Sequence, residues 1–221
     1  MQIAVLWWSY RRFPQLKFAF LEGGSAWGAS LYADIIWHWE TRNKQHLLSN
    51  NNPAIIDKET LVELYTRYGG ELVDGRLDKI GDGLGFHHQL LSPEDPGELD
   101  EFELAGIDQP EDVRDRFLNH FYFGTESDDT RVSQAFNRAA NPFSDRVKAF
   151  LGSDSGHWDV PDITAVTANA YSMAEQEIIT EEDLRYFLSI HPLELYTSLN
   201  QDFFKGTGVE KAADKFLATG D

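Results

Sequence analysis

The sequence contains no cysteine and few basic residues, and each shortage excludes a class of function. Without cysteine the chain has no disulfide, no thiolate metal ligand and no cysteine nucleophile. This composition is typical of a cytoplasmic protein, and we expect that localisation. Only 19 lysine and arginine residues stand against 37 aspartate and glutamate residues, a formal net charge of −18. Because phosphate contacts require clustered lysine and arginine, we expect neither nucleic acid nor a membrane surface as a partner.

Long apolar runs and several common catalytic motifs are missing as well. No apolar run approaches the roughly 18 residues that a membrane-spanning helix requires. The sequence has no H-x-H, H-E-x-x-H or G-x-S-x-G motif and no glycine-rich phosphate loop. A serine hydrolase and a nucleotide-binding protein are therefore not supported. What the chain does have is 42% hydrophobic and 13% aromatic residues, which predicts a packed core.

Three short apolar segments predict buried strands: 16–21 (LKFAFL), 121–125 (FYFGT) and 147–152 (VKAFLG). Helices are predicted between and after these strands, at 25–44, 58–68, 109–120, near 129–140 and beyond 162. In the last of these regions Thr180 and Asp183 are spaced as a capping box, which predicts the start of a helix there. This alternation predicts an α/β protein with parallel strands and a helical C-terminal region. We expect a single domain over residues 1–221, with an irregular insertion at about 70–108.

The helix at 25–44 has a recognisable start and an apolar repeat. Ser25 follows two glycines and is a candidate N-cap. Trp27, Leu31, Ile35 and Trp39 recur every four residues, which predicts that these side chains form the buried face of the helix.

Each predicted strand is followed by an acidic residue, namely Glu22, Glu126 and Asp154. Ligands bind at the carboxyl ends of parallel strands, so these carboxylates are predicted to meet in one pocket. Such a pocket suits a divalent cation or a proton transfer. Acidic residues also cap helices that follow strands, and on spacing alone both interpretations stay open.

The segment 150–162, FLGSDSGHWDVPD, places Asp154 and His157 within reach of one centre. Asp154 is a candidate metal ligand and catalytic base. His157 is a candidate catalytic group, or a group that orients Asp154. Further pocket candidates flank the predicted strand ends: Gly23, Gly24, Ser153 and Asp159.

Four segments together resemble the amidohydrolase-related superfamily: FPQLKFAFLEGGSAWGASLYADIIWHWE, FYFGTESDD, FLGSDSGHWDVPD and NQDFFKGTGVE. More narrowly they are similar to the branch that contains aminocarboxymuconate-semialdehyde decarboxylase. The resemblance implies a partial (β/α)8 TIM barrel in which the three strands are strands six to eight. Asp154 then matches the eighth-strand aspartate that binds or faces a catalytic divalent metal. Glu22 stands where the decarboxylases carry a catalytic histidine, which leaves the reaction type open.

The resemblance implies a metal-dependent hydrolase or a non-oxidative decarboxylase, a carboxy-lyase, acting on a small organic molecule such as a carboxylated or cyclic one. The implied cofactor is zinc or manganese, with Asp154, Glu22 and His157 at the catalytic site. The family's H-x-H pair and fifth-strand histidine have no counterpart, so this chain is expected to be inactive by itself and to need a missing N-terminal half or a second copy. The alternative is a non-catalytic interaction protein that keeps the half-barrel scaffold.

Overall fold

The computed structural model describes residues 12–50, 57–79 and 100–220. Their contacts divide the chain into two compact units. The first runs up to Ile36 and resumes at Glu111, and the second comprises Trp37–Pro110. The expectation of one domain over residues 1–221 stays a prediction.

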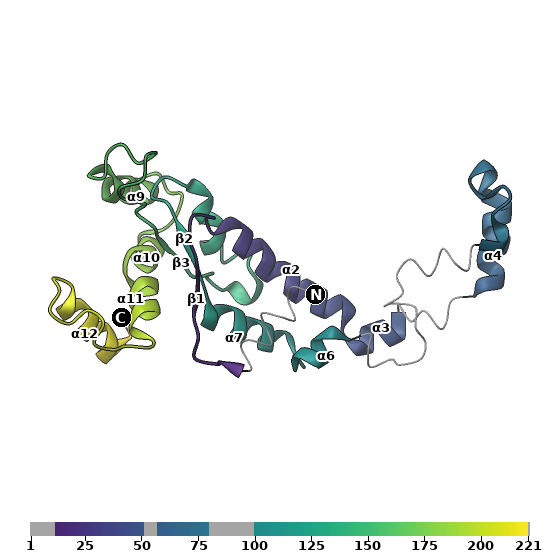
Figure 1. Ribbon diagram of the computed structural model, residues 1–221, viewed down its shortest axis with the longest axis horizontal. Coiled ribbons are helices and arrows are strands. Elements are labelled where there is room, and N and C mark those ends of the chain that lie inside the picture. Colours follow the sequence, from purple (N-terminus) through teal and green to yellow (C-terminus); the bar gives the residue numbers. More distant parts are fainter. Residues whose placement is uncertain (1–11, 51–56, 80–99, 221) are drawn as a thin grey trace. The chain divides into compact units, whose positions relative to one another are not determined.

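The first unit is built on a three-stranded parallel sheet in the order β1-β2-β3 (Figure 1). The strands are β1 (Phe18–Phe20), β2 (Phe121–Thr125) and β3 (Ala149–Leu151). Phe20 pairs with Phe123, and Thr125 pairs with Leu151. The prediction of three parallel strands is confirmed. β1 ends earlier than expected because Glu22 adopts a φ of 62°, which does not continue a strand.

Two helices, α2 (Ala26–Arg42) and α7 (Pro110–His120), cover one face of the sheet. The ring of Phe123 on β2 contacts Trp27 of α2 at 5.0 Å and Phe117 of α7 at 5.9 Å between ring centroids. Gly28 of α2 lies against Phe123 so closely that an added Cβ would come within 2.4 Å of the ring. Glycine is therefore required for this approach of helix and strand.

This close approach sets which face of α2 is buried. The buried residues are Gly28, Ala29, Tyr32, Ile35 and Ile36. Ile35 is buried as predicted, Trp27 packs its ring on Phe20 and Phe123 but stays 38% exposed, and Leu31 and Trp39 are only partly buried. The buried face also includes Gly28, Ala29, Tyr32 and Ile36, which the four-residue repeat did not mark.

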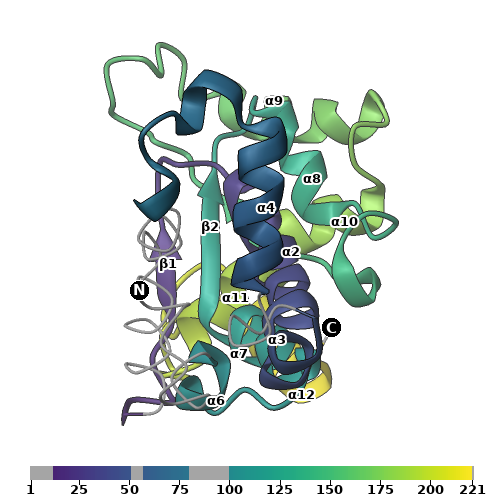
Figure 2. The ribbon, with the colours of Figure 1, turned by 90° about the vertical axis from the view of Figure 1, so that its right-hand side faces the viewer.

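The helix α11 (His191–Thr197) lies on the opposite face of the sheet (Figure 2). There the buried Tyr122 accepts a hydrogen bond from the ammonium of Lys148 at 3.4 Å, and Lys148 pairs with Glu194 of α11. Helices thus cover both faces, whereas a barrel carries its helices as an outer ring. The described residues form a mixed, mostly helical α/β fold with a small parallel sheet, and the expected partial barrel is not confirmed.

The first unit contains further helices after β2 and β3: α8 (Ser133–Phe136), α9 (Ala165–Glu175), α10 (Glu181–Arg185), a π-helical turn (Tyr186–Ile190) and α12 (Glu210–Thr219). The helix predicted near 129–140 is reduced to α8 and a preceding 3-10 turn, Thr130–Val132. The predicted capping box is confirmed, since Thr180 and Asp183 exchange side chain-to-backbone hydrogen bonds.

The second unit holds short helices: α3 (Lys44–Asn50), α4 (Lys58–Tyr68), 3-10 turns at Gly70–Val73 and Leu77–Lys79, and α6 (Glu101–Ala105). α4 matches the predicted helix at 58–68. α6 corrects the prediction that 70–108 is irregular throughout, because the side chain of Asp100 accepts hydrogen bonds from two N–H groups and starts a helix there. The rest of that insertion, residues 80–99, lies outside the described residues. No helix in the described ranges has both the length and the apolar character to cross a membrane.

Candidate metal centre

The parallel strands bring the three strand-end acids to one edge of the sheet. Glu22, Glu126 and Asp154 line the same open cavity of about 300 Å³. Because β1, β2 and β3 run in the same direction, their carboxyl ends lie side by side. The expectation that these carboxylates share one edge is confirmed.

Two of these acids have unusual backbone conformations. Glu22 has a φ of 62° and Asp154 a φ of 45°, both in the left-handed region that side chains other than glycine rarely adopt. Such conformations cost roughly 1–3 kcal/mol each and occur most often at active sites and ligand clamps. Their position at the cavity therefore favours a functional role over simple helix capping.

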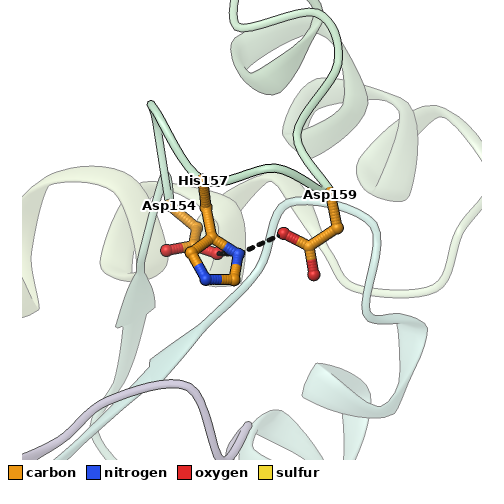
Figure 3. A group of neighbouring side chains, drawn as sticks. All are labelled: Asp154, His157 and Asp159. Carbon is orange, nitrogen blue, oxygen red and sulfur yellow. Dashed lines mark hydrogen bonds and ion pairs between the residues drawn. The ribbon is translucent and has the colours of Figure 1, made fainter.

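His157 lies between two carboxylates in the loop after β3 (Figure 3). One ligand atom from each of Asp154, His157 and Asp159 lies within 4.8 Å of the other two. The Nδ1 atom of His157 is 3.4 Å from Oδ2 of Asp154 and forms a hydrogen bond with Oδ1 of Asp159. The loop closes tightly because Gly156 adopts a φ of 99°, and the N–H of His157 donates to the carbonyl of Asp154 at 3.1 Å. These three residues can hold a metal ion.

All three side chains are accessible to ions from solvent. The exposed fractions are 22% for Asp154, 47% for His157 and 50% for Asp159. Asp154, whose backbone follows β3 most closely, is the least exposed, and the other two lie further along the loop. An open centre of this kind resembles a catalytic metal site, which keeps a coordination position free, more than a closed structural site.

The electrostatics of the edge favour a bound cation. The hydrogen bond that Asp159 accepts from the ring of His157, followed by the charges of Asp159, Asp154 and Glu22, raises the pKa of His157. Partial burial, together with the nearby carboxylates of Asp128 and Asp154, raises the pKa of Glu126. Neighbouring carboxylates contribute to both shifts, and a positive ion bound among them would offset part of their negative charge.

The donor set fits zinc or manganese. One imidazole nitrogen and two carboxylate oxygens are ligand types that both ions accept. Three protein ligands with an open position match the ligand count of catalytic zinc sites. The metal would compete for Nδ1 of His157 with the hydrogen bond to Asp159.

The other predicted site residues divide into two groups. Ser153 lines the cavity described above, and it also lines a second cavity of about 250 Å³ together with Glu126 and Asp159. Gly23 and Gly24 do not line either cavity. An added Cβ at Gly23 would meet the indole of Trp27 at 3.1 Å, and one at Gly24, whose φ is 66°, would meet the carboxylate of Asp129 at 2.8 Å. The two glycines form the turn between β1 and α2.

Two polar residues of the first cavity, Tyr196 and Thr125, were not among the predicted site residues. Tyr196 comes from α11, some 70 residues beyond β2, and no local pattern marks it. Thr125 ends β2 and is 1% exposed, and its hydroxyl has no hydrogen-bond partner within the described part of the chain. A hydroxyl at the end of an otherwise apolar strand, FYFGT, was a signal that could have identified it.

Ser25 occupies the predicted N-cap position before α2, but its side chain does not cap the helix. Its carbonyl accepts a hydrogen bond from the N–H of Ala29, which places it at the start of α2. Its side-chain hydroxyl is buried and forms no hydrogen bond to any described residue, so the side-chain cap is absent.

Comparison of the chain with protein-family models, with curated proteins and with solved structures found no match. The resemblance to the amidohydrolase-related superfamily therefore stays a prediction that depends on the four quoted segments.

Proposed function

We propose that the chain binds a divalent metal ion, zinc or manganese, through Asp154, His157 and Asp159, and that this centre serves a metal-dependent hydrolase or non-oxidative decarboxylase of the amidohydrolase-related type. The observation that carries the proposal is the approach of three ligand atoms to within 4.8 Å. They lie beside a cavity at the carboxyl ends of parallel strands, where α/β proteins bind their ligands.

The bound ion would polarise a substrate oxygen or lower the pKa of a water molecule. Asp154 and Asp159 provide anionic oxygens, and His157 provides a neutral nitrogen once its proton is released. Glu126 lines the cavity without belonging to the metal group, and its raised pKa brings it closer to the range in which a carboxyl group donates and accepts protons. We assign proton transfer to Glu126.

Cavity size sets the class of substrate. The two cavities have volumes of about 300 and 250 Å³ and share Glu126 and Ser153. Volumes of this order accommodate small organic molecules and not polymers. A small substrate held there would lie between the metal group and Glu126.

The proposal is tested by calorimetric titration of the 221-residue chain with zinc and with manganese. We expect the wild type to bind one ion per chain. Each of the variants Asp154→Asn, His157→Gln and Asp159→Asn should bind the ion at least about tenfold more weakly, because loss even of a residue that only supports a metal ligand lowers metal affinity roughly 10–100-fold. Asp202→Asn is the matched control, since Asp202 is exposed and forms an ion pair with Lys205. Absence of binding, or equal affinity in all four variants, would refute the metal centre and favour a non-catalytic interaction protein.

A further inference from the structure

We propose a second site, at the amino ends of the strands, in which the side-chain amine of Lys17 binds a small aldehyde or ketone as an imine. This site lies at the opposite end of the sheet from the metal group and does not depend on the proposed function. In the reaction the nitrogen lone pair attacks the carbonyl carbon and a C–N bond forms. The carbonyl oxygen then leaves as one molecule of water, and a C=N bond takes the place of the C=O bond.

A basic residue stands directly before each of the three strands. Lys17 precedes β1, His120 precedes β2 and Lys148 precedes β3. Because the strands are parallel neighbours, their amino ends lie at the same edge of the sheet, and the pairing of Phe18 with Phe121 places Lys17 beside His120. In a chain with a formal net charge of −18, this edge therefore gathers basic side chains.

The two lysines of this edge differ in their partners. Lys148, whose side chain is 12% exposed, forms an ion pair with Glu194 of α11. Lys17 forms no ion pair with any residue that the structure describes, and its ammonium group instead donates a hydrogen bond to the carbonyl of Asn119 at 2.5 Å. Two ammonium groups thus share one carboxylate, and positive charge is left over at this edge.

The surplus charge favours the neutral amine of Lys17, which is the nucleophilic form. Partial burial, followed by the charge of Lys148, lowers the pKa of Lys17, and the charge of Glu194 acts in the opposite direction. Burial, together with the charges of Lys17 and Lys148, also lowers the pKa of His120. A lysine next to a second cation is activated in this way in enzymes that form imines.

Lys17 is accessible to a small molecule and can keep its hydrogen bond after the reaction. The residue is partly exposed, and its contact with Asn119 lies at the surface. A protonated imine retains one N–H, which can still donate to the carbonyl of Asn119. Lys148 is mostly buried and paired, so Lys17 is the lysine of this edge that a carbonyl compound can reach.

The test is reductive alkylation of the 221-residue chain with propionaldehyde and sodium cyanoborohydride at pH 7. Hydride from the borohydride reduces each imine to a secondary amine, and peptide mass spectrometry gives the rate at each lysine. We expect Lys17 to be modified at least about threefold faster than the exposed Lys211 of α12, because the rate follows the fraction of neutral amine. Modification of Lys17 at the same rate as Lys211, or more slowly, would overturn the inference.

Two variants with opposite expected effects separate charge from accessibility. Lys148→Met removes the neighbouring cation and should slow the modification of Lys17 at least about twofold, whereas Glu194→Gln removes the shared carboxylate and should speed it at least about twofold. Glu63→Gln is the matched control, since this exposed residue lies on α4 in the second unit, and it should leave the rate unchanged.

Looser packing around Lys17 would speed its modification in both variants. Rate changes in the same direction for Lys148→Met and Glu194→Gln would therefore overturn the inference, and so would an equal effect of Glu63→Gln and Glu194→Gln. If a variant does not fold, the comparison of Lys17 with Lys211 in the wild type decides.

Discussion

Substitution of Gly28 by alanine tests how α2 packs on the sheet that carries the site. An added Cβ would lie 2.4 Å, 2.6 Å and 2.8 Å from three ring atoms of Phe123. Ordinary carbon–carbon contacts are about 3.5–4.0 Å, so the ring would have to move by roughly 1 Å. Phe123 is 1% exposed and is enclosed by the rings of Phe20, Trp27 and Phe117, so it has little space to move.

The size of the effect follows from two opposing contributions. Overpacking of a well-packed core costs about 1–3 kcal/mol, at the upper end where the neighbours cannot shift. Alanine stabilises a helix interior by about 1 kcal/mol relative to glycine. We therefore expect Gly28→Ala to lower the free energy of unfolding by about 1–2 kcal/mol, or the melting temperature by roughly 2–8 °C for a chain of this size.

Urea denaturation of wild type and variant measures the difference. Gly208→Ala is the control, because no atom lies within 4 Å of an added Cβ there, and its effect should stay within about 0.5 kcal/mol. In a Phe123→Leu background the cost of Gly28→Ala should shrink, giving a coupling energy of at least about 0.5 kcal/mol. A Gly28→Ala variant as stable as the wild type would show that α2 does not pack on β2 as described.

Three further predictions concern charged and titrating groups. Because Asp159 raises the pKa of His157, an NMR titration of the imidazole should show a lower pKa in Asp159→Asn than in the wild type, and an unchanged pKa would contradict the hydrogen bond. In the wild type, zinc affinity should fall as the pH drops through the pKa of His157, because the protonated imidazole cannot bind the metal. Arg146→Ala removes the ion-pair partner of Asp183, whose side chain is 8% exposed, and should lower the free energy of unfolding by about 3 kcal/mol in urea denaturation. Lys205→Ala removes one partner of an exposed ion pair and should lower it by less than about 1 kcal/mol. Burial lowers the pKa of His191 from 6.5 to about 4, so the unfolded chain takes up the proton at a higher pH than the folded chain, and up to about 3 kcal/mol of stability is lost as the pH falls from 6.5 to 4. His191→Gln should lose less stability over this interval, and equal losses in variant and wild type would refute the lowered pKa of His191.

Local signals in the sequence identified several elements with correct boundaries. FYFGT became β2 because it is a short aromatic run that stops at an acidic turn. KETLVELYTRY became α4, where Asp57 caps the start by accepting two backbone hydrogen bonds and glycines follow the end. The Thr180–Asp183 capping box formed because its partners lie three residues apart. In each case the determining contacts lie within a few residues of each other.

The buried face of α2 shows where such reasoning fails. Periodicity marked Trp27, whose ring packs on Phe123, but it did not mark Gly28, which lies against the same ring, or Tyr32, which is fully buried. The decisive contact is between Gly28 and Phe123, residues 95 positions apart, and periodicity within the helix does not report which face fits a given ring.

The amino-acid sequence determined the three strands, the acid that follows each, and the D-x-x-H-x-D loop whose side chains group because they lie within six residues. Tertiary structure alone decided that Tyr196 completes the cavity lined by Glu22, Glu126 and Asp154, and that the hydroxyl of Thr125 is buried without a partner among the described residues. The physical reason is that these contacts join segments far apart in the chain, and only the packing of helices on both faces of the sheet brings them together.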